Sequence, residues 1–347
     1  MRREGQEGQR PLRVSTASGS FQHMAESEFD IIQHYFSGRQ PGRADVVAGI
    51  GDDAALLRVA PGSELVVCMD TLVAGVHFPE STAAAAIGHK ALAVNLSDLA
   101  AMGAEPAWAT LALTLPASDP DWLRAFADAF FTLADSHGVQ LVGGDTTCGP
   151  LAVTVQAHGF VPAGQALRRR GARPGDRVYV TGTLGDAGLA LHEGVSVPPG
   201  LQARLDFPQP RIAAGLALRG QASAAIDISD GLLADLGHLL EYDGLGATLQ
   251  VDAVPRSADF LAGLQPLGAA GEALFYELPL AAGDDYELCF TVPEDRCHAV
   301  QRRLAEIACA GTLVGVIDEV PGIRCHRSTG EPYHPSSSGY RHFNEAG

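Results

Sequence analysis

Lysine is almost absent from this sequence: Lys90 is the only one in 347 residues. A P-loop needs lysine in the pattern G-x-x-x-x-G-K-[ST], and Lys90 follows His89, so the sequence excludes that loop. A strand lysine of the protein-kinase type is excluded as well. Any nucleotide must therefore be held by metal ions, arginines and backbone N–H groups.

Positive charge is scarce overall, with 24 Lys+Arg against 41 Asp+Glu and a formal net charge of −17. Nucleic-acid binding requires a basic surface that replaces phosphate counterions, so we predict no nucleic-acid partner. Docking on an anionic membrane is excluded for the same reason. No apolar run reaches the 18 or more residues that a membrane-spanning helix needs, so we predict no membrane segment.

Clustered cysteines and an N-terminal apolar segment are also missing. The six cysteines are scattered without a C-x-x-C pair, which argues against a zinc site or a disulfide framework and fits a reducing, cytoplasmic setting. Residues 1–23 are polar and rich in Arg, Gly, Gln and Ser, so they do not resemble a secretory signal. We expect them to form a disordered extension.

The hydrophobic patterns predict alternating strands and helices. Apolar or alternating runs at 64–70, 108–115, 140–142, 151–161, 177–181 and 225–228 predict strands, whereas 82–102 and 119–138 predict helices. This order, rich in βαβ segments but without a regular repeat, predicts an α+β or mixed α/β fold. The arginine-rich segment 164–176 predicts a junction between two domains, 24–163 and 164–347.

Acidic residues recur where apolar strands end beside glycine. Ligands gather at such strand ends, and a carboxylate there must be solvated, paired or bound to metal. With so few basic partners, hard oxygen ligands favour Mg²⁺, and several Mg²⁺ ions are suited to holding a polyphosphate. The alternative is that each aspartate caps a helix or satisfies a turn. The residues are Asp52, Asp53, Asp70, Asp145, Asp227, Asp230, Asp284 and Asp285, with Asp98 on the Ala-rich helix.

Three other features are weaker. The Gly-rich stretch 182–188 is able to cradle phosphate through N–H groups, but is equally typical of a tight turn. The cluster 168–170 is the densest positive charge, suited to clamping phosphate or to a solvated loop. His77 follows the strand of Asp70 closely enough to contact a substrate, although a lone histidine is more often structural.

Taken together, these stretches resemble the thiamine-monophosphate kinases of the aminoimidazole-ribonucleotide-synthetase-like superfamily. The resemblance implies a two-domain fold and ATP-dependent phosphorylation of thiamine phosphate to thiamine diphosphate. It also implies a homodimer whose N-terminal sheets form a barrel, with the active site between the two domains. The matching segments are GIGDDAAL (49–56), MDTLVAGVHF (69–78), KALAVNLSDLAAMGAEPAW (90–108), LVGGDTT (141–147), GFVPAGQALRRRGARPGD (159–176), VTGTLGDAG (180–188), AIDISDGLLADLGH (225–238) and GDDYELCF (283–290).

The resemblance also implies roles for individual residues. Asp70 and Asp145 are central to catalysis, Gly144, Asp145, Arg169 and Ser229 contact ATP, and His77, Asp284 and Ser337 line the thiamine phosphate site. The Mg²⁺ ligands are Asp53, Asp70, Asp98, Asp145, Asp227 and Asp230.

The chain departs from the family pattern at four positions. Asp284 stands where the family usually has Glu. Cys68 and Met69 replace Ser or Thr, so that only their backbone carbonyls are able to reach a metal. Ser337 replaces a Trp that packs on the thiamine ring, which leaves the stacking to another residue such as Tyr340.

Charge predicts the mechanism. The acceptor phosphate is largely ionised at neutral pH, so it needs relief of repulsion more than a strong base. We therefore expect direct in-line transfer of the γ-phosphoryl group, with Mg²⁺ bridging donor and acceptor and Arg169 steadying the nucleotide. Two alternatives remain open: another ATP-dependent enzyme of the same superfamily, or a non-catalytic module that binds Mg-nucleotide.

Overall fold

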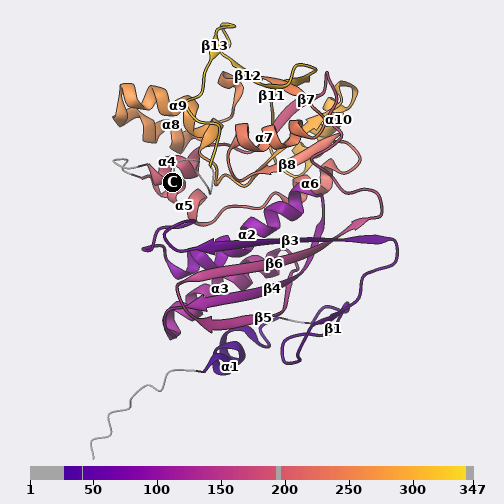
Figure 1. Cartoon of the computed structure of the whole chain (residues 1–347), viewed down its shortest axis with the longest axis vertical. Coiled ribbons are helices and arrows are strands. Elements are labelled where there is room, and N and C mark those ends of the chain that lie inside the picture. The colour runs from indigo at the N-terminus through magenta and orange to yellow at the C-terminus, as the bar shows by residue number, and fades with distance from the viewer. Residues whose placement is uncertain (1–26, 41, 193–196, 341–347) are drawn as a thin grey trace, which may run out of the picture.

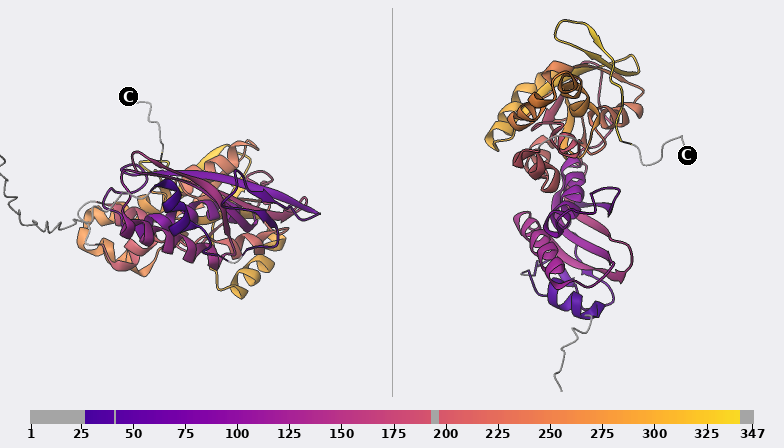
Figure 2. Two further views of the ribbon diagram at one scale, coloured as in Figure 1. Left: turned by 90° about the horizontal axis from the view of Figure 1, so that it is seen from below. Right: turned by 90° about the vertical axis from the view of Figure 1, so that its left-hand side faces the viewer.

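The computed structural model describes residues 27–40, 42–192 and 197–340, and the predicted extension 1–23 lies outside them. The chain forms two halves, each with its own sheet and helices, stacked along the long axis of the molecule (Figures 1 and 2). The predicted mixed α/β class is confirmed. No helix in the described ranges is long and apolar enough to cross a membrane.

The first half is built on a four-stranded sheet with the order β3-β6-β4-β5. These strands are β3 (Ser63–Val73), β4 (Glu105–Leu115), β5 (Gln140–Cys148) and β6 (Ala152–Pro162). Helices α2 (Ala84–Ala101) and α3 (Pro120–Ser136) cover one face of the sheet (Figure 1). A short N-terminal part precedes them, with α1 (Glu28–Ile31), the π-helix Ile32–Phe36, β1 (Val46–Ala48) and β2 (Leu56–Leu57).

Helix α2 is buried on almost every side, because it packs on β3 and β6, on α3, and on elements of the second half. Because it is covered on all these sides, the helix is rich in alanine, leucine and valine and has no continuous polar face. The helix ends at Ala101, one residue before the predicted end, with Met102 as its C-cap, and Gly103 follows in the left-handed conformation (φ +64°). Its start differs from the predicted residue 82, because the helix begins at Ala84 after an N-cap, Ala83, that makes no side-chain hydrogen bond.

The second half is built on a seven-stranded sheet with the order β13-β12-β9-β11-β7-β10-β8. Its strands are β7 (Arg177–Thr181), β8 (Ala224–Ile228), β9 (Gly246–Gln250), β10 (Glu287–Val292), β11 (Gly311–Asp318), β12 (Gly322–His326) and β13 (Pro332–Tyr333). Its helices are α4 (Asp186–Leu191), α5 (Pro199–Asp206), α6 (Ile212–Leu218), α7 (Leu232–Glu241), α8 (Ala258–Leu264), α9 (Ala269–Ala281) and α10 (Cys297–Glu306), with 3₁₀ turns at Val251–Ala253, Gln265–Leu267 and Glu294–Arg296. The predicted boundary at 163/164 falls between β6 and β7 and stays a prediction.

Strand β5 is longer than the sequence indicates. The glycines after Val142 predict a loop, but the strand continues to Cys148 and pairs in parallel with β4. Gly144 makes this possible, because a Cβ at that position would lie 1.8 Å from the carbonyl oxygen of Leu111. The close approach of two backbones therefore requires glycine here.

One buried ionic network joins the helices of the second half to its sheet. The carboxylate of Glu287 has no solvent exposure and accepts hydrogen bonds from Arg211 (2.5 and 2.6 Å), Arg204 (2.9 Å) and the hydroxyl of Thr181 (2.6 Å). A buried carboxylate is tolerated only with such partners. None of these four residues lines the site described below, and the network holds α5 and α6 against β10.

Candidate functional site

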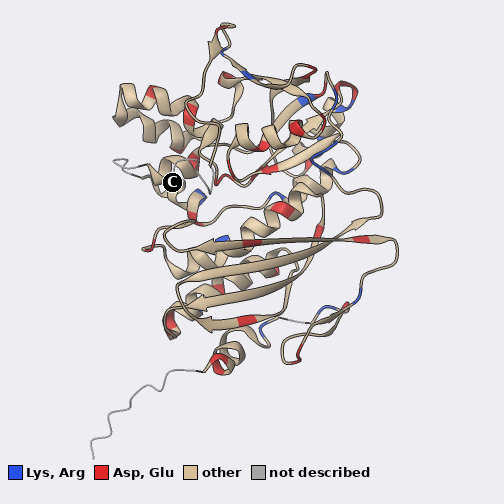
Figure 3. Cartoon of the chain, in the orientation of Figure 1, with Lys and Arg blue, Asp and Glu red and all other residues tan. Residues whose placement is uncertain are grey.

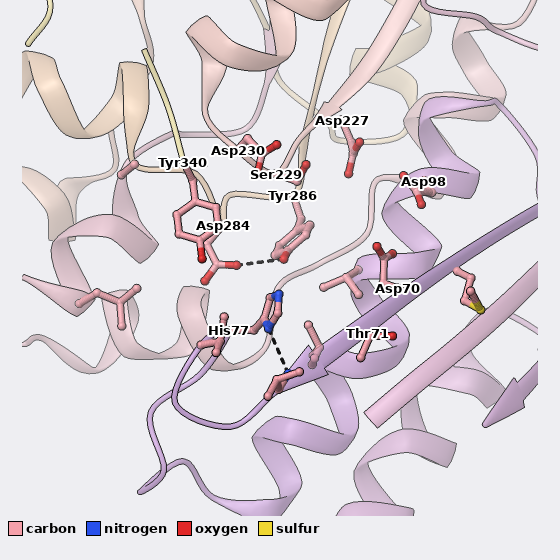
Figure 4. Close-up of a pocket in the computed structure, with 17 residues that line it drawn as sticks. Asp70, Thr71, His77, Asp98, Asp227, Ser229, Asp230, Asp284, Tyr286 and Tyr340 are labelled. Atoms are coloured by element: carbon pink, nitrogen blue, oxygen red, sulfur yellow. Dashed lines mark hydrogen bonds between the residues drawn. The ribbon is translucent and has the colours of Figure 1, made fainter. Parts of the chain in front are cut away.

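Five aspartates line one cleft of about 550 Å³ between the two halves, hereafter the acidic cleft (Figure 4). They are Asp70, Asp98, Asp227, Asp230 and Asp284. The first two come from β3 and α2 of the first half, and the other three come from β8, the loop after it and the loop before β10. Figure 3 shows acidic residues on both sides of this junction. The cleft therefore exists only when the halves are docked.

The first-half aspartates are held by the contact between β3 and α2. The backbone N–H of Asp70 donates to the amide oxygen of Asn95 at 3.1 Å. Asp98 lies one turn further along the same helix and therefore faces the same side. From the opposite side, Asp227 accepts the hydroxyl of Ser97 at 2.8 Å. Asn95 and Ser97 of α2 thus bind the two walls of the cleft.

A buried residue that the sequence analysis missed shapes the loop after β8. One carboxylate oxygen of Asp235 accepts the backbone N–H groups of Ser229, Asp230 and Gly231 at 3.0, 3.1 and 3.0 Å. These bonds turn the loop so that Ser229 and Asp230 line the cleft. The signal in the sequence is an aspartate four residues after the glycine that starts a helix, a position suited to capping the helix start.

The carboxylates of the cleft oppose one another's ionisation. Burial raises the pKa of Asp70, and burial together with the charges of Asp227 and Asp70 raises the pKa of Asp98 to about 8. Burial likewise raises the pKa of Asp227 to about 6, against the stabilising bond from Ser97. No lysine or arginine is among the described residues lining the cleft, although the nearby charge of Arg169 acts on Asp98 and Asp227. Such a site favours a bound cation.

The carboxylates of the cleft fit Mg²⁺ ions whose coordination is completed by water and substrate. Within the described ranges, no three Asp, Glu, His or Cys side chains are arranged to hold one ion by themselves. Mg²⁺ typically takes only one or two carboxylates and completes its coordination with water and substrate phosphates. Hard oxygen donors on both walls of an open cleft meet that requirement, whereas a site made of protein ligands alone is not present in the described residues.

The remaining predicted metal and nucleotide residues lie elsewhere in the chain. Asp53, Gly144 and Asp145 line a second cavity of about 930 Å³ beside the N-terminal helix, hereafter the edge pocket. Strands β3 and β5 are the two edges of the first sheet, so three strand spacings separate Asp70 from Asp145, roughly 14 Å. Within one chain, the six predicted ligands therefore form two groups and do not converge on one point.

Two of the three predicted substrate residues, His77 and Asp284, line the cleft (Figure 4). The ring Nδ1 of His77 accepts the backbone N–H of Val73 at 3.0 Å, so the neutral imidazole carries its proton on Nε2. Tyr340 also lines the cleft, and its N–H donates to the carbonyl of Asp230 at 2.9 Å. Ser337 is not among the lining residues, and its hydroxyl accepts the N–H of Gly339 at 3.2 Å.

The Gly-rich stretch 182–188 serves the packing of the second half. Gly185 is left-handed (φ +90°), and its N–H donates to the buried carboxylate of Asp285 at 2.9 Å. An N–H group engaged in this way is not available to a phosphate. Arg170, in the basic cluster, lies over the ring of Tyr242, with its guanidinium carbon 4.1 Å from the ring centre.

The chain matches two family models, AIR synthase related protein, N-terminal domain, over residues 51–161 and AIR synthase related protein, C-terminal domain, over residues 173–327. It is 47% identical to the thiamine-monophosphate kinase of Salmonella typhimurium over 329 residues, which is 92% of this chain and 99% of that protein.

Solved structures give the same result. The crystal structure of thiamine-monophosphate kinase from Stenotrophomonas maltophilia is 46% identical, with a TM-score of 0.75 over 84% of this chain and 93% of that chain. A structure described as AaThiL complexed with AMPPCP and TMP is 29% identical, with a TM-score of 0.70 over 82% of this chain and 89% of that chain. The chain therefore belongs to the thiamine-monophosphate kinase family, as its sequence motifs predict.

Proposed function

We propose that this chain phosphorylates thiamine phosphate to thiamine diphosphate with ATP, and that the reaction takes place in the acidic cleft. The family membership supports the reaction, and a relative's structure holds AMPPCP together with TMP. The observation that carries the location is the convergence of five aspartates from both halves in a cleft that no lysine or arginine lines among the described residues.

The chemistry that the residues must supply is mainly electrostatic. The acceptor phosphate is largely ionised near neutral pH, and phosphoryl transfer requires positioning and neutralisation of oxygens. The carboxylates of Asp53, Asp70, Asp98, Asp145, Asp227 and Asp230 would hold Mg²⁺, which when bound neutralises and orients phosphate oxygens. We propose direct in-line transfer of the γ-phosphoryl group to the phosphate of the acceptor.

Other side chains in and beside the cleft would act on the ligands directly. Arg169 provides positive charge beside Asp98 and Asp227, where a nucleotide phosphate would lie. His77 lines the cleft with its ring held through Nδ1 by the N–H of Val73, and it would contact the acceptor there. Tyr340 offers an aromatic ring in the place that Ser337 leaves without one.

We further propose that two copies of the chain complete the site as a homodimer. Strand β3 is an 11-residue edge strand, and its outward side chains Leu65, Val67 and Met69 are 42%, 48% and 62% exposed. A long, apolar edge strand tends to pair with another chain. Pairing of β3 with β5 of a second copy would close a barrel and bring Asp145 of the partner subunit near Asp70.

The assay is incubation with Mg-ATP and thiamine phosphate, followed by oxidation to fluorescent thiochrome esters. We expect the diphosphate ester, and we expect Asp70→Ala and Asp145→Ala each to abolish it while the circular dichroism spectrum is unchanged. ATP binding without consumption would indicate a non-catalytic module. Full activity in both variants would refute the assignment of the site.

A further inference from the structure

The only lysine of the chain has a specific place at the junction of the two halves. Lys90 lies on α2 and is 4% exposed. Its ammonium donates to Oδ2 of Asp284, in the other half, at 2.6 Å. Burying an ammonium group is costly unless it is paired, so this contact fixes both the lysine and the carboxylate.

The segment that carries Asp284 is conformationally strained. Asp284 and Tyr286 are left-handed, with φ of +62° and +51°, although neither is glycine. Their N–H groups donate to the carbonyls of Ser229 and Ile228, each at 2.8 Å. The hydroxyl of Tyr286 donates to Oδ1 of Asp284 at 2.9 Å (Figure 4). Strained residues that are held by several contacts are typical of functional sites.

The ion pair also separates Asp284 from the other aspartates of the cleft. Among the described residues, Asp284 is the only one of the five aspartates that forms an ion pair with a lysine or arginine. The other four keep negative charge that a metal ion would neutralise. Asp284 is already neutralised, so it is suited to accept a hydrogen bond from an organic ligand and not to bind a cation of its own.

We propose that Lys90 is a positioning residue, which sets the direction of the Asp284 carboxylate at the thiamine end of the cleft without touching the substrate. The inference rests on the proposed function, because it requires thiamine phosphate in the cleft. Thiamine carries an amine, whose N–H groups a fixed carboxylate oxygen is suited to accept. Lys90 therefore controls recognition of thiamine phosphate and leaves the nucleotide unaffected.

The test compares steady-state kinetics of Lys90→Met, which keeps the aliphatic chain and removes the charge, with Asp284→Asn and the double variant. We expect each single variant to raise KM for thiamine phosphate about tenfold, with kcat and KM for ATP changed less than about twofold. The double variant should be no worse than Asp284→Asn alone, because Lys90 acts through that carboxylate. Lys90→Gln, which keeps a donor, should give a smaller increase and serves if Lys90→Met does not fold.

A matched control is Arg211→Met, which removes one ion-pair partner of Glu287 away from the cleft. It should lower the melting temperature and leave both KM values unchanged. Equal increases in both KM values for Lys90→Met, a change in melting temperature alone, or additive effects in the double variant would overturn the inference. A wild-type protein that is inactive with thiamine phosphate would instead refute the proposed function.

Discussion

Mixing two inactive variants tests whether the site is shared between subunits. Asp70 lies on β3 and Asp145 on β5, at opposite edges of one sheet. If each site takes Asp70 from one chain and Asp145 from its partner, then D70N and D145N are both inactive as homodimers. A heterodimer of the two has one site with both aspartates intact and one site that lacks both.

The expected recovery follows from counting subunits. Random association of equal amounts gives about half heterodimers, each with one working site of two, so the mixture should have about one quarter of wild-type activity. Co-purification with two different tags should raise the recovery to about one half. A site formed within one chain would give no recovery at all.

The assay is the thiochrome measurement on co-expressed variants, with heterodimers verified by sequential affinity purification. The matched control is D70N with D227N, because both residues line the acidic cleft of the same chain. Each site of that heterodimer lacks one aspartate, so no activity should return. Absent recovery in verified D70N–D145N heterodimers, or equal recovery in the control pair, would refute the shared site.

Three further predictions concern stability, each measured by chemical denaturation. Gly144→Ala should lower the free energy of unfolding by at least about 2 kcal/mol, because the new Cβ would lie 1.8 Å from a carbonyl oxygen of β4. The control Gly143→Ala should have little effect, because the space around its Cβ is open. Glu287→Gln should cost about 3 kcal/mol, since it removes the buried negative charge that faces the half-buried Arg204 and Arg211. Glu294→Gln, at an exposed ion pair, should change stability little, and equal losses would contradict this. Burial lowers the pKa of His137 in the folded protein. As the pH falls below about 6.5, the imidazole is therefore protonated in the unfolded chain before it is protonated in the folded one, which favours unfolding. Stability should therefore fall with pH more steeply in wild type than in His137→Gln, and parallel curves would contradict the assignment.

The sequence by itself determined the class of fold and the kind of chemistry. A single lysine excluded the P-loop, and acids beside glycine at strand ends indicated a cation and phosphate site. Asp70 and Asp227 stand at such strand ends and Asp98 on the Ala-rich helix, and the structure brings the three together in the acidic cleft. The fold class could be predicted because hydrophobic period, turn residues and motif spacing are local properties of the chain, whereas the cation site stays a prediction.

Only the tertiary structure decided which distant residues meet. The order β3-β6-β4-β5 separates Asp70 from Asp145, and nothing in the spacing of the two residues along the chain records that order. The docking of α2 on the second half brings Lys90 to Asp284 across 194 positions of sequence. Such pairings are set by sheet order and side-chain packing, which combine segments far apart in the chain and therefore leave no local pattern in the sequence.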